Sequence, residues 1–211
     1  MWGCFPLYWA LLNHVNPSEV LIHRMLWAVP VLFFLVHFKT SWKSNFKRSL
    51  SSKKELVLLL ITAILITINW GGYIFAVNLG RVVEASMGYF LSPVFNMIGG
   101  YIFFHERISR LKQLAVFFAT IGALYYVLSG DSFPWLGFVV GFTFSAYGIA
   151  RKAMSSSAVP GLYIETLILL PFLLIFSLWF YTNYDIAFFN IDISTDILLF
   201  LAGAVTVVPL A

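Results

Sequence analysis

The chain has 211 residues, of which 61% are hydrophobic, 18% aromatic and only 10% charged. Soluble globular domains carry about 25% charged residues, so this composition excludes a soluble domain and indicates a protein of the lipid bilayer. The 22 Phe, 10 Tyr and 7 Trp also exclude a disordered chain. A single cysteine, Cys4, excludes an internal disulfide and a thiolate cluster, and the sequence predicts neither a metal nor a cofactor.

Apolar segments of membrane-helix character follow one another along the chain. A helix needs about 20 apolar residues to cross the hydrocarbon core. The end segments 1–12 and 196–211 are shorter, and residues 1–12 lack the basic start and cleavage site of a signal peptide. We therefore expect an all-α polytopic membrane protein, and interpret the chain as a fragment with about eight helices, the end ones partial. The predicted spans are 18–38, 56–79, 82–104, 113–129, 135–150 and 161–181.

Membrane topology explains the formal net charge of +4. Eleven of the 13 Lys and Arg residues lie in segments 39–55, 105–112 and 151–160, which share one side if every predicted span crosses. The positive-inside rule therefore predicts that these three basic loops are cytoplasmic. No polybasic arm on a soluble module is present, so the sequence predicts no nucleic-acid partner.

Local signals at the helix boundaries fit these spans. Segment 16–19 predicts a helix start, with Ser18 as the N-cap. Segment 130–134, with its glycine and proline, predicts a tight outer turn. After a longer outer loop, Ser194 or Thr195 is expected to cap the last helix.

Three local matches recur at a nearly constant spacing and suggest an internal repeat. At offsets of 145, 141 and 139 residues, the matched pairs are Trp2-Gly3 with Tyr147-Gly148, Arg24 with Glu165, and 66–68 with 205–207. Five spans separate the copies, so the second copy would lie inverted in the membrane. Inverted repeats are typical of secondary transporters, whose substrate site lies near the midplane. Chance similarity among apolar helices is the alternative explanation.

Small and polar residues form stripes along several predicted spans. Ionisable groups within spans are costly and usually face a cavity or a partner, so one interpretation is a central cavity lined by these stripes. The alternatives are helix packing for the Gly and Ser residues and helix capping for Glu84. The stripes consist of Glu19, His23, Trp27, Pro30 and His37 on span 18–38, Thr62, Asn69, Gly72, Tyr73, Ala76 and Gly80 along span 56–79 and just beyond it, Glu84, Gly88, Ser92, Asn96 and Gly99 on span 82–104, and Gly137, Gly141 and Ser145 on segment 135–150.

Several stretches of the chain resemble one known family. They are SEVLIHRMLW, NWGGYIFAVNLGRVVEASMGYFLSPVFN, HERISRLKQLAVFFATIGALYYV, FSAYGIARK and ETLILLP. These stretches are similar to the RarD group of the EamA transporters, in the drug/metabolite transporter superfamily. The resemblance implies ten helices in two inverted five-helix repeats, here residues 1–129, with the first helix truncated, and 131–211, cut within the third helix. It also implies export of small metabolites or drugs across a bacterial inner membrane, either proton-coupled or facilitated.

The motif positions of this family, together with Tyr73 from its polar stripe, supply the residues expected to face a substrate cavity. Glu84 and His23 are the candidates for proton coupling, because a buried carboxylate or imidazole can titrate near neutral pH. The expected partners are a small molecule, the lipid bilayer and protons; a homodimer is compatible with the sequence but unsupported by it. The cavity candidates are His23, Arg24, Asn69, Trp70, Tyr73, Glu84, Ser86, Tyr89, Asn96, Tyr147 and Glu165.

Two other functions stay open at this point. A membrane receptor or sensor that binds a metabolite without transport is the main alternative, although loop 39–55 is too short for an output domain. An integral membrane enzyme is disfavoured, because His105-Glu106 lacks the second histidine of a zinc protease and no nucleophile elbow or phosphate-binding loop occurs. We therefore expect a secondary transporter with alternating access around a midplane cavity, and no enzyme.

Overall fold

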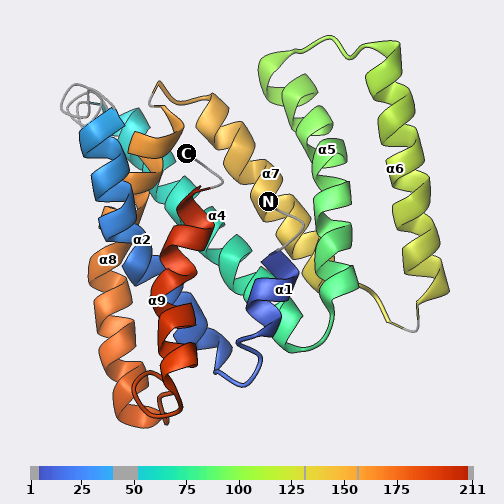
Figure 1. Cartoon of the computed structure of the whole chain (residues 1–211). Helices are drawn as coiled ribbons and strands as arrows, with labels where there is room; N and C mark the ends of the chain where they lie inside the picture. The colour runs from blue at the N-terminus through green and yellow to red at the C-terminus, as the bar shows by residue number, and fades with distance from the viewer. Residues whose placement is uncertain (1–4, 40–51, 131, 156, 209–211) are drawn as a thin grey trace. The chain divides into compact units, whose positions relative to one another are not determined.

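The computed structural model is all-helical in the residues that it describes, 5–39, 52–130, 132–155 and 157–208 (Figure 1). Part of the basic loop 39–55, and Asp131 in the predicted turn, lie outside the described residues. The all-α prediction is confirmed. The helices are α1 (Phe5–Ala10), α2 (Pro17–Lys39), α4 (Lys53–Asn78), α5 (Val82–Phe104), α6 (Arg110–Ser129), α7 (Trp135–Lys152), α8 (Ala158–Asn183) and α9 (Ile193–Val207).

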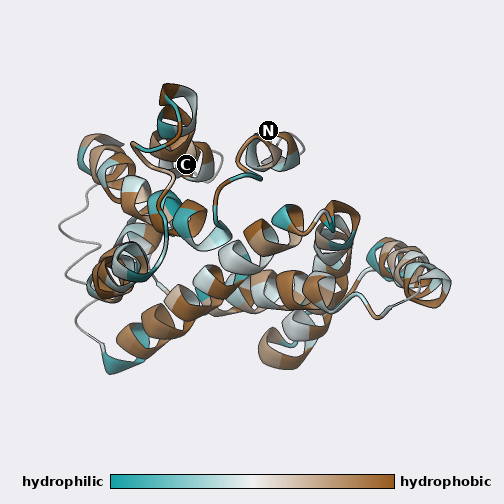
Figure 2. Ribbon diagram, turned by 90° about the horizontal axis from the view of Figure 1, so that it is seen from below, coloured by the Kyte–Doolittle hydropathy of each residue, from teal (hydrophilic) through white to brown (hydrophobic). Residues whose placement is uncertain are grey.

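Five helices, α2, α4, α5, α6 and α8, are long and apolar enough to cross a membrane. Hydrophobic residues, brown in Figure 2, predominate along the helices of the ribbon, and α9 is a shorter apolar helix. The predicted span 135–150 forms α7, which is not among the five. Three glycines, a threonine and a serine lower its hydropathy, and its two basic residues stand at its end. The chain is a multi-pass membrane protein.

The helices group into two compact units. Unit 1 comprises Met1–Ala63 and Met154–Ala211, and unit 2 comprises Ile64–Ala153. In unit 1, α2 packs on α8 and α9; in unit 2, α5 packs on α6 and α7. Each unit thus combines helices from both predicted repeats, so the units do not coincide with residues 1–129 and 131–211.

Helices α2 and α8 are related by the offset of one of the three sequence matches. Helix α2 begins at Pro17 and α8 at Ala158, a separation of 141 positions. The same separation relates Pro30 inside α2 to Pro171 inside α8. An equal spacing of both the helix starts and the internal prolines is expected if the two helices descend from one ancestral segment.

In unit 2, α5 and α7 pack with their backbones in direct contact. A Cβ atom added at Gly141 would lie 2.4 Å from the carbonyl oxygen of Gly88, and one added at Gly88 would lie 2.4 Å from that of Gly137. The hydroxyl of Ser145 donates a hydrogen bond to the carbonyl of Ser92 at 3.1 Å. The small-residue stripes of these two helices are therefore a packing surface, as the helix-packing alternative predicted.

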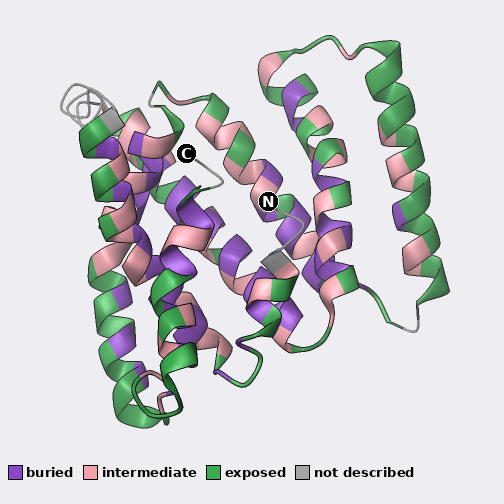
Figure 3. Cartoon of the chain, viewed as in Figure 1, coloured by how far each residue is buried: buried purple, intermediate pink, exposed green. Residues whose placement is uncertain are grey.

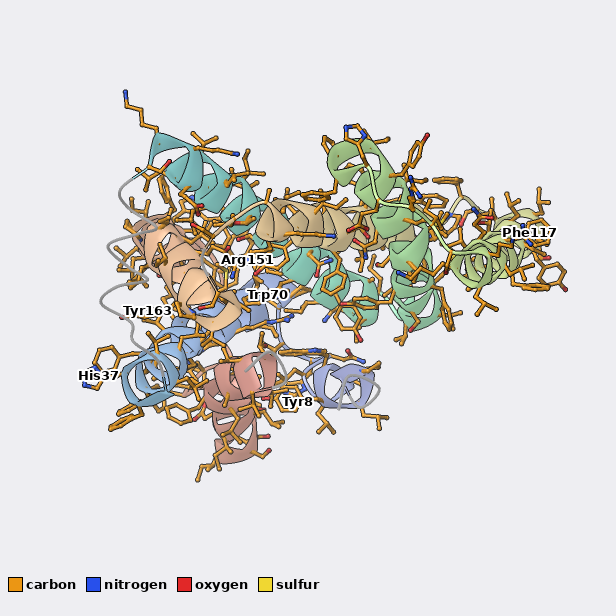
Figure 4. The ribbon with its side chains drawn as sticks, turned by 90° about the horizontal axis from the view of Figure 1, so that it is seen from above. Tyr8, His37, Trp70, Phe117, Arg151 and Tyr163 are labelled. Carbon is orange, nitrogen blue, oxygen red and sulfur yellow. The ribbon has the colours of Figure 1, made fainter. Side chains whose placement is uncertain are left out.

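Unit 1 contains a second close helix contact. A Cβ atom added at Gly203 on α9 would lie 2.2 Å from the carbonyl carbon of Trp27 on α2. The hydroxyl of Tyr8 on α1 donates a hydrogen bond to the carbonyl of Leu198, so α1 is held to α9 (Figure 4). His14, after α1, lies with Nε2 3.0 Å from the hydroxyl of Thr195.

Two helix caps differ from the sequence prediction. Asn16, and not Ser18, caps α2: its side chain accepts a hydrogen bond from the Ser18 N–H at 3.0 Å, with Pro17 in the first helical position. Asp192 caps α9, accepting from the Thr195 N–H at 2.6 Å. This bond, with one from the Ser194 hydroxyl, holds the pKa of Asp192 below its ordinary value. The stabilisation by this cap is therefore present above the ordinary carboxyl pKa and is lost as the pH falls through the lowered one.

Helix α6 is exposed along most of its length (Figure 3). Ala123 is its buried residue, and the large side chains of Phe117, Phe118 and Tyr125 are more than half exposed. In a membrane such a surface suits contact with lipid chains, which are as apolar as these side chains.

The α5–α7 contact predicts which glycines tolerate a methyl group. We expect Gly141→Ala to force the two helices apart and to lower stability by about 1–3 kcal/mol. Gly122→Ala on α6 is the matched control, because nothing lies within 4 Å of the added atom, and it should leave the melting temperature unchanged or raised. Thermal unfolding of the purified proteins in detergent, followed by tryptophan fluorescence, measures both. Equal melting temperatures would contradict the backbone contact.

Candidate functional site

The predicted cavity residues divide between the two units. Unit 1 holds His23, Arg24 and Glu165, and unit 2 holds the other eight. Among the described residues of unit 1, four ionisable side chains are at most 3% exposed: Glu19, His23 and Arg24 on α2, and Glu165 on α8. A charge inside a membrane span is costly unless other groups compensate it, so the contacts of each side chain indicate its role.

Glu19 fastens the loop between α8 and α9 to the first turn of α2. Its carboxylate accepts hydrogen bonds from the backbone N–H of Ala187, at 2.9 and 3.0 Å to the two oxygens, and of Phe188 at 2.9 Å. The next residue, Phe189, has a left-handed φ of 62° and donates its N–H to Asp196. Glu19 was not among the predicted site residues, although the sequence places it in the first turn of its helix and on the same face as His23, one turn further on.

His23 is hydrogen-bonded through both ring nitrogens. Its Nδ1 lies 3.1 Å from the indole nitrogen of Trp27, and its Nε2 lies 3.2 Å from the hydroxyl of Tyr181 on α8. The ring also packs on Phe188, with 4.4 Å between ring centres. Because an indole N–H can only donate, Nδ1 is the acceptor and the neutral ring carries its proton on Nε2. Protonation of Nδ1 would therefore break the bond to Trp27.

Arg24 lies over an aromatic ring of α1. The central carbon of its guanidinium group is 4.9 Å from the centre of the Trp9 ring, within the range of a cation–π interaction. Trp9 is 2% exposed, and its indole N–H has no hydrogen-bond partner in the part of the chain that the structure describes. Sequence reasoning missed Trp9, because it lies in the short N-terminal segment. A buried donor next to a buried cation suits a solute that carries a hydrogen-bond acceptor or a negative charge.

Glu165 receives a hydrogen bond from α4. The hydroxyl of Thr62, itself fully buried, donates to its carboxylate at 2.6 Å. Thr62 belongs to the polar stripe of α4, and this contact explains its place on that face. The Glu165 carboxylate thus joins α8 to the first half of α4 within unit 1.

In unit 2, Glu84 holds the beginning of α7. Its Oε1 accepts hydrogen bonds from the backbone N–H of Leu136 at 2.7 Å and of Gly137 at 3.4 Å. Its Oε2 lies 2.6 Å from Nε of Arg81, one helical turn earlier. A carboxylate at the positive end of a helix dipole is stabilised there, so these contacts favour the capping alternative, with α7 as the capped helix.

The remaining candidates of unit 2 make mostly structural contacts. Asn69 donates to the carbonyl of Val140 at 2.8 Å and lies 3.2 Å from the hydroxyl of Thr143, so its amide is directed to α7. Ser86 donates to the carbonyl of Val82 on its own helix at 2.9 Å. The polar groups of these two side chains are therefore engaged within the protein.

One aromatic cluster brings two of the predicted residues together. The ring of Tyr89 lies 5.8 Å from that of Tyr73 and 5.6 Å from that of Phe144, measured between ring centres. Trp70 is buried and Tyr147 is half-buried, whereas Asn96 is exposed on α5. No group of three or more His, Cys, Asp or Glu side chains suited to a metal ion occurs among the described residues.

Polar contacts join the basic loops within each unit. In unit 1, Ser155 donates its N–H and its hydroxyl to Glu55 at 2.9 and 2.7 Å. In unit 2, Lys152 forms an ion pair with Glu106. The hydrogen bond that Lys152 donates within this pair lowers the pKa of the Glu106 carboxyl. These contacts bring together residues of segments 39–55 and 151–160 in unit 1, and residues of segments 105–112 and 151–160 in unit 2.

Comparison with known proteins adds a family and several relatives. The model of the EamA-like transporter family matches residues 1–128. The uncharacterized transporter YojE of Bacillus subtilis is 36% identical over 214 residues, covering 100% of this chain and 70% of the relative. Protein RarD of Salmonella typhi is 35% identical, and protein RarD of Escherichia coli is 34% identical; each alignment covers 100% of this chain and 71% of the relative. No solved structure matches the chain.

The contacts of Glu84 predict that its loss loosens the start of α7. Glu84→Gln keeps the size of the side chain but removes the charge that pairs with Arg81 and strengthens the bonds to α7, so we expect a loss of about 1.5–3 kcal/mol. Hydrogen exchange followed by mass spectrometry should show faster exchange of the amides at 136–137. Ser86→Ala is the control, since its hydroxyl bonds only within α5. Exchange as slow as in the unaltered protein would refute the capping role.

Proposed function

This chain belongs to the EamA-like transporter family, and from that premise we propose that it is a secondary transporter that exports small metabolites or drugs across a bacterial inner membrane. The family and the apolar helices identify a multi-pass membrane transporter. Export, alternating access around a midplane cavity, and the two inverted repeats 1–129 and 131–211 are parts of the proposal. The equal spacing within α2 and α8 supports the repeats.

The observation that carries this proposal is the Arg24–Trp9 pair of unit 1. A guanidinium group stays charged at all physiological pH values, so its burial in a membrane span is costly and indicates a function. The neighbouring indole N–H is buried without a partner in the described structure. We propose that the transported solute binds beside these two groups, with an acceptor atom on the Trp9 N–H and negative charge near Arg24.

For proton coupling, the contacts favour His23 over Glu84. The Glu84 carboxylate is engaged by Arg81 and the backbone of α7, which suits a fastening role. His23 connects α2 to α8 through Tyr181, and a proton on Nδ1 would displace Trp27. Protonation would thereby change the packing of α2 next to Arg24, which is the linkage that proton-driven export requires.

The proposal predicts a loss of flux when the charge at position 24 is removed. We expect Arg24→Gln to reduce efflux at least tenfold at equal membrane abundance, while the control Arg110→Gln, on an exposed residue, retains it. Cells lacking their own copy would be profiled by mass spectrometry for metabolites inside and outside. In the same assay His23→Gln should abolish the dependence of flux on the pH gradient. Full flux in Arg24→Gln would remove Arg24 from the mechanism, and no flux in the unaltered protein would favour a receptor.

The proposed orientation, with loops 39–55, 105–112 and 151–160 in the cytoplasm, has a direct test. In a Cys4→Ser background, Ala153→Cys should be protected from a membrane-impermeant maleimide in intact cells and should react after permeabilisation. Ser132→Cys, also exposed, is the matched position in the predicted outer turn and should react in intact cells. The reverse pattern would invert the topology.

A further inference from the structure

We propose that a small carboxylate binds in a recess of unit 2, with Arg81 as its anchor. The recess lies where the α4–α5 turn and the first turn of α5 meet the end of α6 and the segment that precedes α7. Its volume is about 290 Å³, near the lower limit of small-molecule sites, so an occupant would be the size of a simple organic acid. Of its lining residues, Gly80 and Glu84 belong to the polar stripes, and Glu84 also stands at a family motif position. We call it the Arg81 recess.

Arg81 is held in a geometry that leaves one edge of its guanidinium group available. Its Nε is 2.6 Å from Oε2 of Glu84, and its side chain remains 32% exposed. That ion pair is made through Nε, so the edge formed by the two terminal nitrogens is separate from it. The flat edge formed by two such nitrogens binds a carboxylate through two parallel hydrogen bonds, a geometry that lysine cannot offer.

Glu84 orients the guanidinium group of Arg81 through an ion pair that uses only its Nε atom. The Glu84 carboxylate also accepts two backbone hydrogen bonds at the start of α7, so its negative charge is shared among several donors. A second carboxylate at Arg81 is therefore repelled less than it would be beside an unbonded glutamate. A ligand that draws Arg81 away from Glu84 would also loosen the fastening of α7.

The other walls define the rest of the ligand. Val83 and Tyr126 supply apolar surface, and the hydroxyl of Ser132 supplies one further polar contact. A monocarboxylate with a small apolar or aromatic body fits these walls better than a dianion or a cation. This site goes beyond the proposed function: it is composed of unit 2 residues other than the Arg24–Trp9 pair, and binding to it requires no transport.

The experiment compares three small aromatic probes that differ in charge, the anion benzoate, the neutral benzamide and the cation benzylammonium, on the purified protein in lipid nanodiscs. Saturation-transfer NMR should report binding of benzoate in the millimolar range and at least tenfold weaker binding of the other two. Arg81→Lys keeps the charge but loses the flat edge, and should weaken benzoate binding about tenfold. Arg107→Lys, on an exposed arginine of a basic loop, is the matched control and should bind as the unaltered protein does.

A second variant tests the site without altering Arg81, in case the substitution of Arg81 itself disturbs folding. Val83 is 67% exposed and lines the recess, so Val83→Trp should fill it and abolish benzoate binding with the Arg81–Glu84 pair intact. Val57→Trp, at an exposed valine of α4, should have no effect. The proposal is overturned by equal binding of benzoate and benzamide, by preference for benzylammonium, by no benzoate binding, or by binding that survives Val83→Trp. None of these results depends on a measurement of flux. If benzoate binding fails, the transport proposal is therefore unaffected and is tested separately by the efflux assay.

Discussion

Inside a bilayer, a buried polar group has to find its partner within the protein, because no water is present to supply one. Two glutamates meet this constraint by the same device. Glu19 is the third residue of α2 and Glu84 the third residue of α5. Each accepts backbone N–H groups from a distant segment, Glu19 from residues 187–188 and Glu84 from residues 136–137. A side chain near the start of one helix thereby fixes the segment that leads into another helix.

The same constraint separates structural polar groups from functional ones. Asn69, Ser145 and Glu84 lie on polar stripes, yet each has its hydrogen bonds satisfied by a neighbouring helix, which explains their burial through packing alone. The indole N–H of Trp9 is different, because no described group accepts it and a buried cation lies against its ring. Buried donors are rarely left without a partner, so such a group points to a solute rather than to the fold.

Hydropathy and small-residue spacing determined how much of this structure the sequence could predict. The long spans follow from apolar length, and the glycines four residues apart in segment 135–150 predict a close helix contact, although they do not identify α5 as the partner. The two units could not be predicted, because they depend on which helices pair across the two predicted repeats. Glu19 and Arg81 were missed for a related reason. The partner of Glu19 lies 168 residues away in the sequence. The proposed role of Arg81 depends on a recess that four separate segments of the chain form together.

The predicted repeat allows the contacts of two buried charged residues of unit 1, one on α2 and one on α8, to be compared. At an offset of 141 residues, Arg24 on α2 corresponds to Glu165 on α8, so matched positions carry opposite buried charges. Glu165 has the hydroxyl of Thr62 as a partner. Across the offsets of 139 to 141, the counterparts of Thr62 are Leu201, Ala202 and Gly203, none of which has a polar side chain. The positions of α9 that match Thr62 therefore carry no hydroxyl, and Gly203 instead brings the backbone of α9 against α2. At these matched positions, therefore, the carboxylate accepts a hydrogen bond from a hydroxyl of α4, whereas the guanidinium group lies over the buried ring of Trp9.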